Sequence, residues 1–183
     1  MIKRFLFIFT LLFLFFFLEF CKSYEKIPKD CFKIDGIFGP EDFIFLEKEN
    51  LFLISSHNRR NFELLGEIYS YNLANNELKA IPRIGEPKDL SFRPHGIDFY
   101  NERLYVILHG KEQKSKWHGV GIYKWNGKEL IFEKLIENEL LHSPNDIAVY
   151  SNTIFFLTND SKNRGSLWEF FYHFLLESTK EAS

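Results

Sequence analysis

The sequence predicts an all-β fold, and specifically a β-propeller, because one short segment recurs three times along the 183-residue chain. The copies begin at Pro40, Pro94 and Pro144, at spacings of 54 and 50 residues, and each runs into a short apolar strand. A second apolar strand follows each copy, at residues 51–56, 104–109 and 154–159. Short strands that repeat with this period are typical of propeller blades.

The first two copies continue into two further strands, which completes a four-stranded unit. The third strands are expected at residues 67–72 and 121–126, and the fourth at 78–81 and 130–135. The turns between them are rich in Asn and Gly, which tolerate the left-handed backbone of tight hairpins. Proline at the head of each first strand is compatible with a sheet, because its missing N–H would break a ladder bond only inside the strand.

The number of copies is smaller than a closed ring requires. Propellers close with about four to eight blades, whereas residues 31–163 predict about three. Three explanations stay open: a fragment of a longer protein, an association of two copies, or a chain that does not fold stably. The net charge of -2, with no basic stripe and no zinc-finger spacing, predicts no nucleic-acid partner.

Residues 1–22 form a separate region with the features of a signal peptide or membrane anchor. Lys3 and Arg4 precede an apolar run from 5 to 18, which is short for a membrane span. The segment is expected to be cleaved near Ser23, retained as an anchor, or followed by lipidation of Cys21. Each outcome predicts an exported chain that is membrane-attached or secreted.

Export would permit disulfide bonds, and the chain has two cysteines, Cys21 and Cys31. If Cys21 is removed or lipidated, Cys31 is left without a partner within the chain. An odd cysteine in an exported protein indicates that its partner is elsewhere.

Polar side chains directly behind the repeating prolines are the candidate site. Equivalent positions of successive blades face the central axis, so Glu41, His95 and Asn145 are expected to converge, with Asp42 and Asp146 one residue further along. Carboxylate and amide oxygens are the ligands that Ca²⁺ prefers. Adjacent positions on a strand face opposite ways, which suggests two ions. The competing interpretation is that these Asp and Asn residues only cap turns.

Two histidines are candidates for proton transfer, His95 in the repeat and His109 at the end of the following strand. Imidazole titrates near neutral pH, so either could activate a water molecule. Asp160 is a further, less strongly indicated candidate. The remaining histidines carry no motif and are interpreted as structural: His57, His118, His142 and His173.

Several segments, taken in order, resemble the serum paraoxonase/arylesterase family. They lie at residues 39–42, 54–56, 92–97, 104–109, 139–141 and 144–147. The resemblance runs from about Cys31 to the C-terminus and covers the first half of such a protein. It implies a six-bladed propeller with two calcium ions in its central tunnel, here truncated to about three blades, that hydrolyses aryl esters and lactones.

The resemblance also implies a role for each candidate residue. Glu41 and Asn145 match ligands of the catalytic calcium, whereas Asp42, the backbone carbonyl of Ile97 and Asp146 match ligands of the structural calcium. His95 matches the water-activating base and His109 its partner. Cys31 matches half of the disulfide that closes the family's ring. The family's histidine after the aspartate at 160 is replaced by Ser161, and the remaining ligands of the catalytic calcium would lie beyond Ser183.

Residues 164–183 are predicted to form an amphipathic helix, since apolar residues recur at helical spacing. These are Leu167, Phe170, Phe171, Phe174 and Leu175. Three roles stay open for this segment: contact with a lipid surface, packing on the propeller, or exposure by truncation.

The function expected from the sequence is therefore calcium-dependent hydrolysis of small aryl esters or lactones by an incomplete member of this family. The alternative is a non-catalytic, membrane-attached half-propeller or gene remnant, whose missing half could be supplied by another chain. A weaker alternative is a sugar-acid lactonase of the propeller type, which would share the metal but not the paired histidines.

Overall fold

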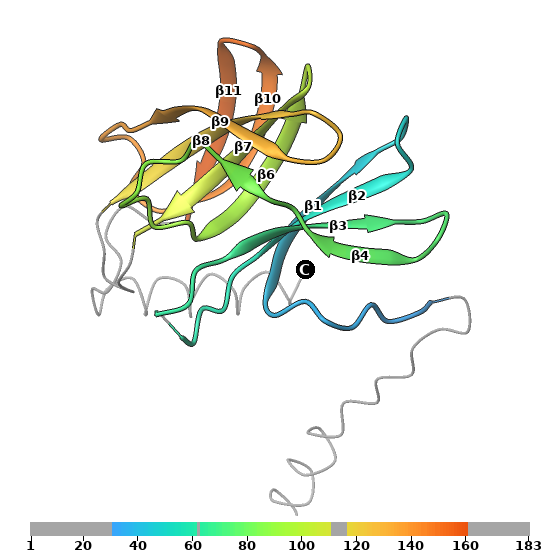
Figure 1. Cartoon of the computed structure of the whole chain (residues 1–183). Coiled ribbons are helices and arrows are strands. Elements are labelled where there is room, and N and C mark those ends of the chain that lie inside the picture. The colour runs from blue at the N-terminus through green and yellow to red at the C-terminus, as the bar shows by residue number, and fades with distance from the viewer. Residues whose placement is uncertain (1–30, 62, 111–116, 161–183) are drawn as a thin grey trace, which may run out of the picture. The chain divides into compact units, whose positions relative to one another are not determined.

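The computed structural model describes residues 31–61, 63–110 and 117–160, and all of its strands lie in the unit that begins at Gly36. These residues form an all-β, propeller-like fold in which successive sheets follow one another along the chain (Figure 1). The predicted terminal segments 1–22 and 164–183 lie outside the described residues. No helix within the described ranges is long and apolar enough to cross a membrane.

The first sheet has the predicted order of four antiparallel strands. Neighbouring strands pair in sequence order. They are β1 (Pro40–Leu46), β2 (Leu51–Ser56), β3 (Glu67–Asn72) and β4 (Glu77–Ala80). Asn50 and Asn76 take the left-handed backbone in the two tight hairpins, with φ of 53° and 57°, as expected for Asn in such turns.

The second sheet repeats this order and adds one strand that the sequence did not predict. Its members are β6 (Pro94–Tyr100), β7 (Arg103–His109), β8 (His118–Trp125), β9 (Leu130–Ile136) and β5 (Arg83–Ile84). The two-residue strand β5 pairs in parallel with the outer strand β9. A strand this short has no periodicity for sequence analysis to detect.

The third copy of the repeat forms the strand pair β10 (Pro144–Ser151) and β11 (Ile154–Asn159). Each of the three first strands therefore begins at its predicted proline. In each, the register with the following strand shifts just after that proline, between Pro40 and Asp42, Pro94 and Ile97, and Pro144 and Ile147. A bulge changes the direction of nearby side chains, so the repeated irregularity falls where the candidate site residues lie.

The core explains why β7 is apolar at almost every position. Alternate residues of β7 enter two different apolar clusters: Leu104, Val106 and Leu108 pack with sheet-one residues such as Leu53. Tyr105 and Ile107 pack on the other face with residues such as Ile147 of β10. Side chains alternate between the faces of a strand. The second sheet is therefore covered on both faces, by the first sheet and by the third.

Candidate functional site

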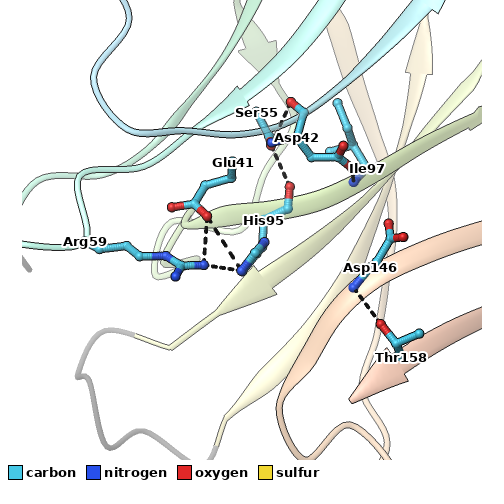
Figure 2. Close-up of polar contacts among 8 residues, drawn as sticks. All are labelled: Glu41, Asp42, Ser55, Arg59, His95, Ile97, Asp146 and Thr158. Carbon is cyan, nitrogen blue, oxygen red and sulfur yellow. Dashed lines mark hydrogen bonds and ion pairs between the residues drawn. The ribbon is translucent and has the colours of Figure 1, made fainter. Parts of the chain in front are cut away.

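The site begins with the predicted pair Glu41 and His95, which the starts of β1 and β6 bring together (Figure 2). Glu41 Oε2 lies 3.7 Å from His95 Nε2, and the two side chains are only 13% and 12% exposed. Two equivalent positions of the repeat, each directly after its proline, therefore lie close together in the structure. Burial raises the pKa of the Glu41 carboxyl, and the Arg59 guanidinium opposes this shift.

Arg59 is a member of the site that sequence analysis missed. Its Nη2 atom lies 2.7 Å from Glu41 Oε2 and also contacts His95 Nε2 (Figure 2). A guanidinium group has donors and no acceptor, so the imidazole nitrogen accepts this hydrogen bond with its lone pair. Arg59 lies between β2 and β3, in a segment without a recognisable motif, and therefore gave no signal in the sequence.

Ser55 connects the two strands that carry Glu41 and His95. Its side chain is fully buried, and its Oγ donates to the backbone carbonyl of His95 at 2.6 Å. The same Oγ accepts a hydrogen bond from the Asp42 N–H at 3.1 Å. Sequence analysis considered no such role, because a serine that bridges two distant strands leaves no local pattern.

Asp42 connects the first sheet to the second. Its Oδ2 accepts from the Ile97 N–H and its Oδ1 from the Phe43 N–H, both at 2.8 Å. The pKa of its carboxyl is raised, chiefly by burial and further by the negative charges of Asp146 and Asp98, while the two N–H donors act in the opposite direction. The predicted role of Ile97 uses its backbone carbonyl, whereas its contact with Asp42 is made by its N–H.

Asp98 makes the corresponding connection between the second and third sheets, and it was not predicted. Its Oδ2 accepts from the Val149 N–H at 2.6 Å and its Oδ1 from the Phe99 N–H at 2.7 Å. It lies four residues after its proline, whereas Asp42 and Asp146 lie two residues after theirs. That offset kept it outside the pattern on which the prediction was based.

Asn145 and Asp146 reach the site through the close approach of β10 to β6. A Cβ atom added to Gly96 would lie 2.5 Å from the Asn145 carbonyl oxygen and 2.8 Å from the Asp146 Cα, so only glycine fits there. The Asp146 N–H donates to Thr158 Oγ1 at 3.2 Å (Figure 2). Within the described residues no hydrogen bond or ion pair joins Glu41 to Asn145.

The predicted histidines His95 and His109 lie next to each other, and a third ring, that of His118, extends them into a row. The centroids of His95 and His109 are 5.1 Å apart, and those of His109 and His118 are 4.8 Å apart and nearly perpendicular. His118 faces His109 across the β7–β8 pairing and is 8% exposed. Sequence analysis assigned His118 only a structural role, because pairing across a hairpin is not visible in a linear motif.

The other predicted residues are Asp160, three further histidines and Cys31. The Asp160 N–H donates to the Ser143 carbonyl just after β11. His57 is buried against Arg93, His142 is exposed, and His173 lies outside the described residues. Cys31 is exposed and has no disulfide partner among the described residues.

The donor chemistry suits a calcium ion that also takes amide, carbonyl and water oxygens. Asp98 and Asp146 both raise the pKa of Asp42, which shows a concentration of negative charge that a cation would relieve. In the part of the chain that the structure describes, no three His, Cys, Asp or Glu side chains form a set that could hold a metal alone. Calcium commonly completes its shell with carbonyls and waters.

Comparison with known proteins identifies the family. The model of the arylesterase family matches residues 50–179. The chain belongs to the arylesterase family. It is also similar to serum paraoxonase/lactonase 3 from Homo sapiens, with 29% identity over 159 residues, which are 79% of this chain and 44% of that protein. The chain thus spans less than half the length of this relative. The family predicted from the motifs is confirmed.

Proposed function

We propose that this chain carries part of the active site of a calcium-dependent hydrolase of aryl esters and lactones. The observation that carries the proposal is the convergence of Glu41 and His95 beside the start of β10, in a chain of the arylesterase family. The Homo sapiens relative is called a paraoxonase/lactonase, which favours esters and lactones as the substrate class.

The chain's oxygen donors divide into two groups behind the repeating prolines. Glu41 and Asn145 would hold a catalytic calcium ion, while Asp42, the Ile97 carbonyl and Asp146 would hold a structural one. Calcium, when bound, supplies polarisation of the substrate carbonyl and stabilisation of the oxyanion that forms. Support comes from the oxygen-rich donor set and from the mutual repulsion of the carboxylates.

His95 would act as the general base through Nε2, the ring nitrogen that faces Glu41. It would take a proton from water as the water oxygen attacks the ester carbonyl carbon, and return it to the departing aryloxide of an aryl ester or alkoxide of a lactone. His109, whose ring lies 5.1 Å away, would orient the His95 ring as its partner. The close packing of the two rings restricts their motion and favours a fixed base.

Export and lipid contact form a separate part of the proposal. The apolar segment 1–22 supports an exported chain that is membrane-attached or secreted, and the name of the relative places that protein in serum. A companion chain could supply the remaining blades and a cysteine for Cys31. Exposed Tyr150 and Phe156, at 72% and 65%, lie on the third sheet, where a further blade would cover apolar surface.

The function is tested by hydrolysis of phenyl acetate and of a simple lactone, with the whole chain in calcium. We expect His95→Gln to reduce kcat by about 10²- to 10⁴-fold, as for loss of a general base. Removal of calcium with EDTA should abolish turnover, and added calcium should restore it. The matched control is His142→Gln, because His142 is exposed and outside the histidine row.

Two results would contradict the proposal. Hydrolysis that survives both EDTA and the His95 substitution would show that neither the cation nor this base is used. Absence of turnover by the whole chain, with calcium and substrate in excess, would favour the non-catalytic half-propeller.

A further inference from the structure

The feature that the proposed mechanism leaves unexplained is the guanidinium group of Arg59. It contacts the Glu41 carboxylate that would bind calcium and also the His95 nitrogen that would take a proton from water. One cation from the chain itself therefore engages two groups that the reaction needs.

The loop that carries Arg59 is fixed close to Glu41 at its base. The His57 N–H donates to the Gly39 carbonyl at 2.9 Å, and this contact joins the start of the loop to the residue before Pro40. Gly39 has φ of 62°, and a Cβ there would lie 2.4 Å from the His57 carbonyl oxygen. The turn continues with the Arg60 N–H on Asn58 Oδ1 at 3.1 Å. This arrangement delivers the side chain of the intervening Arg59 to the site.

The ion pair between Arg59 and Glu41 forms in the structure but is weak enough to be displaced. The Arg59 side chain is 53% exposed, whereas that of Glu41 is 13% exposed. An ion pair with one well-solvated partner is worth little, so its free energy is within the range that a divalent cation can overcome. Arg59 belongs to neither apolar cluster of the described residues, so its exposed guanidinium can move into solvent.

The Arg59 guanidinium and a calcium ion cannot both occupy the position beside the Glu41 carboxylate. A calcium ion on Glu41 Oε2 would bring a divalent charge next to the guanidinium, which already lies 2.7 Å from that oxygen. While Arg59 donates to His95 Nε2, that lone pair cannot accept a proton from water. Departure of Arg59 would therefore release the cation ligand and the base in one movement.

We propose that Arg59 is a displaceable internal cation that holds Glu41 and His95 in an inactive pairing and competes with calcium for Glu41. The inference rests on the proposed function, because it assigns Glu41 to a calcium ion. It adds a regulatory residue that lies outside the repeat and outside the ligand set.

The test is calcium binding to the whole, metal-stripped chain by isothermal titration with calcium chloride. We expect Arg59→Gln to tighten calcium binding by about fivefold, the upper range for an exposed ion pair. The matched control is Arg60→Gln, which removes the neighbouring exposed charge; no ion pair is recorded for Arg60 among the described residues. Its calcium affinity should equal that of the wild type.

A second comparison ties the effect to Glu41. The tightening caused by Arg59→Gln should disappear when Glu41→Gln is already present, because the two substitutions then act on the same contact. Unchanged or weaker binding in Arg59→Gln overturns the inference but leaves the calcium proposal intact. An equal gain in Arg60→Gln also overturns it, since that result would indicate a general charge effect.

The remaining outcomes also separate the two proposals. Calcium binding by Arg59→Gln alone, with none by the wild type, would support the inference. If neither protein binds calcium, both the calcium proposal and the competition are wrong. Suppose that calcium binding differs between wild type and Arg59→Gln as expected, but neither protein hydrolyses phenyl acetate. This result would contradict the proposed reaction and not the role of Arg59.

Discussion

Gly96 shows how one missing atom lets two strands meet at the site. The backbone of β10 passes so close to Gly96 that any Cβ would overlap the Asn145 carbonyl oxygen. Its φ is not in the left-handed region, so the requirement is space and not backbone conformation. The same contact places Asn145 and Asp146 beside the residues that follow Pro94, which makes Gly96 a structural determinant of the candidate calcium site.

We expect Gly96→Ala to destabilise the fold by about 1–3 kcal/mol, because the obstructing atoms belong to backbone and cannot rotate away. Urea unfolding followed by tryptophan fluorescence measures the change. Gly119→Ala is the control, because the nearest atom there is Leu135 Cδ1 at 3.0 Å, and a leucine side chain can move. An equal loss of stability in the two variants would argue against the close backbone approach as the cause.

Aspartate side chains act at the scale of elements, where they join one sheet to the next. Asp42 of the first sheet accepts a hydrogen bond from the Ile97 N–H of the second. Asp98 of the second sheet accepts one from the Val149 N–H of the third, and we call these two connections the joints between the sheets. These N–H groups lie near register shifts, where a bulged strand leaves backbone donors outside the regular ladder. The carboxylates satisfy part-buried N–H donors at both connections.

We expect Asp98→Ala to cost about 1–3 kcal/mol, since it removes the acceptor of both the Val149 and Phe99 amides. Amide hydrogen exchange gives the sharper measurement: the Val149 amide should lose protection, while amides of β3 keep theirs. Asp89→Ala, at an exposed position, serves as the control. Unchanged protection of Val149 would show that the carboxylate does not hold the joint.

The elements were predictable to the extent that their signals are local. The prolines, apolar strands and polar hairpins each occupy a few consecutive residues, and the structure places β1, β6 and β10 at the predicted starts. Glu41 and His95 converge because they share a repeat position. Arg59, Ser55 and Asp98 were missed, since each acts through a partner at least 13 residues away with no motif of its own. Long-range pairing of this kind is determined only by the folded topology.

At the scale of the whole molecule, the joint between the first two sheets contains a buried pair of basic groups. Arg93 is fully buried just before β6, and its Nη1 lies 3.1 Å from Nε2 of His57, which follows β2. Burial, followed by the positive charges of Arg93 and Arg59, lowers the pKa of His57 to about 4. The imidazole is therefore neutral in the fold and accepts a hydrogen bond from Arg93 at neutral pH.

This pair predicts how the stability of the fold depends on pH. Between about pH 6.5 and pH 4 the unfolded chain binds a proton at His57 and the folded chain does not, so falling pH favours unfolding. The contribution of His57 is complete above pH 6.5 and decreases by about 2 kcal/mol between pH 6.5 and pH 5.

His57→Gln keeps an acceptor for Arg93 and removes the titration. The difference in unfolding free energy between wild type and His57→Gln should therefore shift against the wild type as pH falls, while His142→Gln, at an exposed position outside this joint, is the control. Urea titrations at pH 7.5, 6.0 and 5.0 measure these differences, in which the opposing effects of the raised pKa values of Glu41 and Asp42 cancel. Parallel pH curves for the wild type and His57→Gln would show that His57 is not held neutral at this joint.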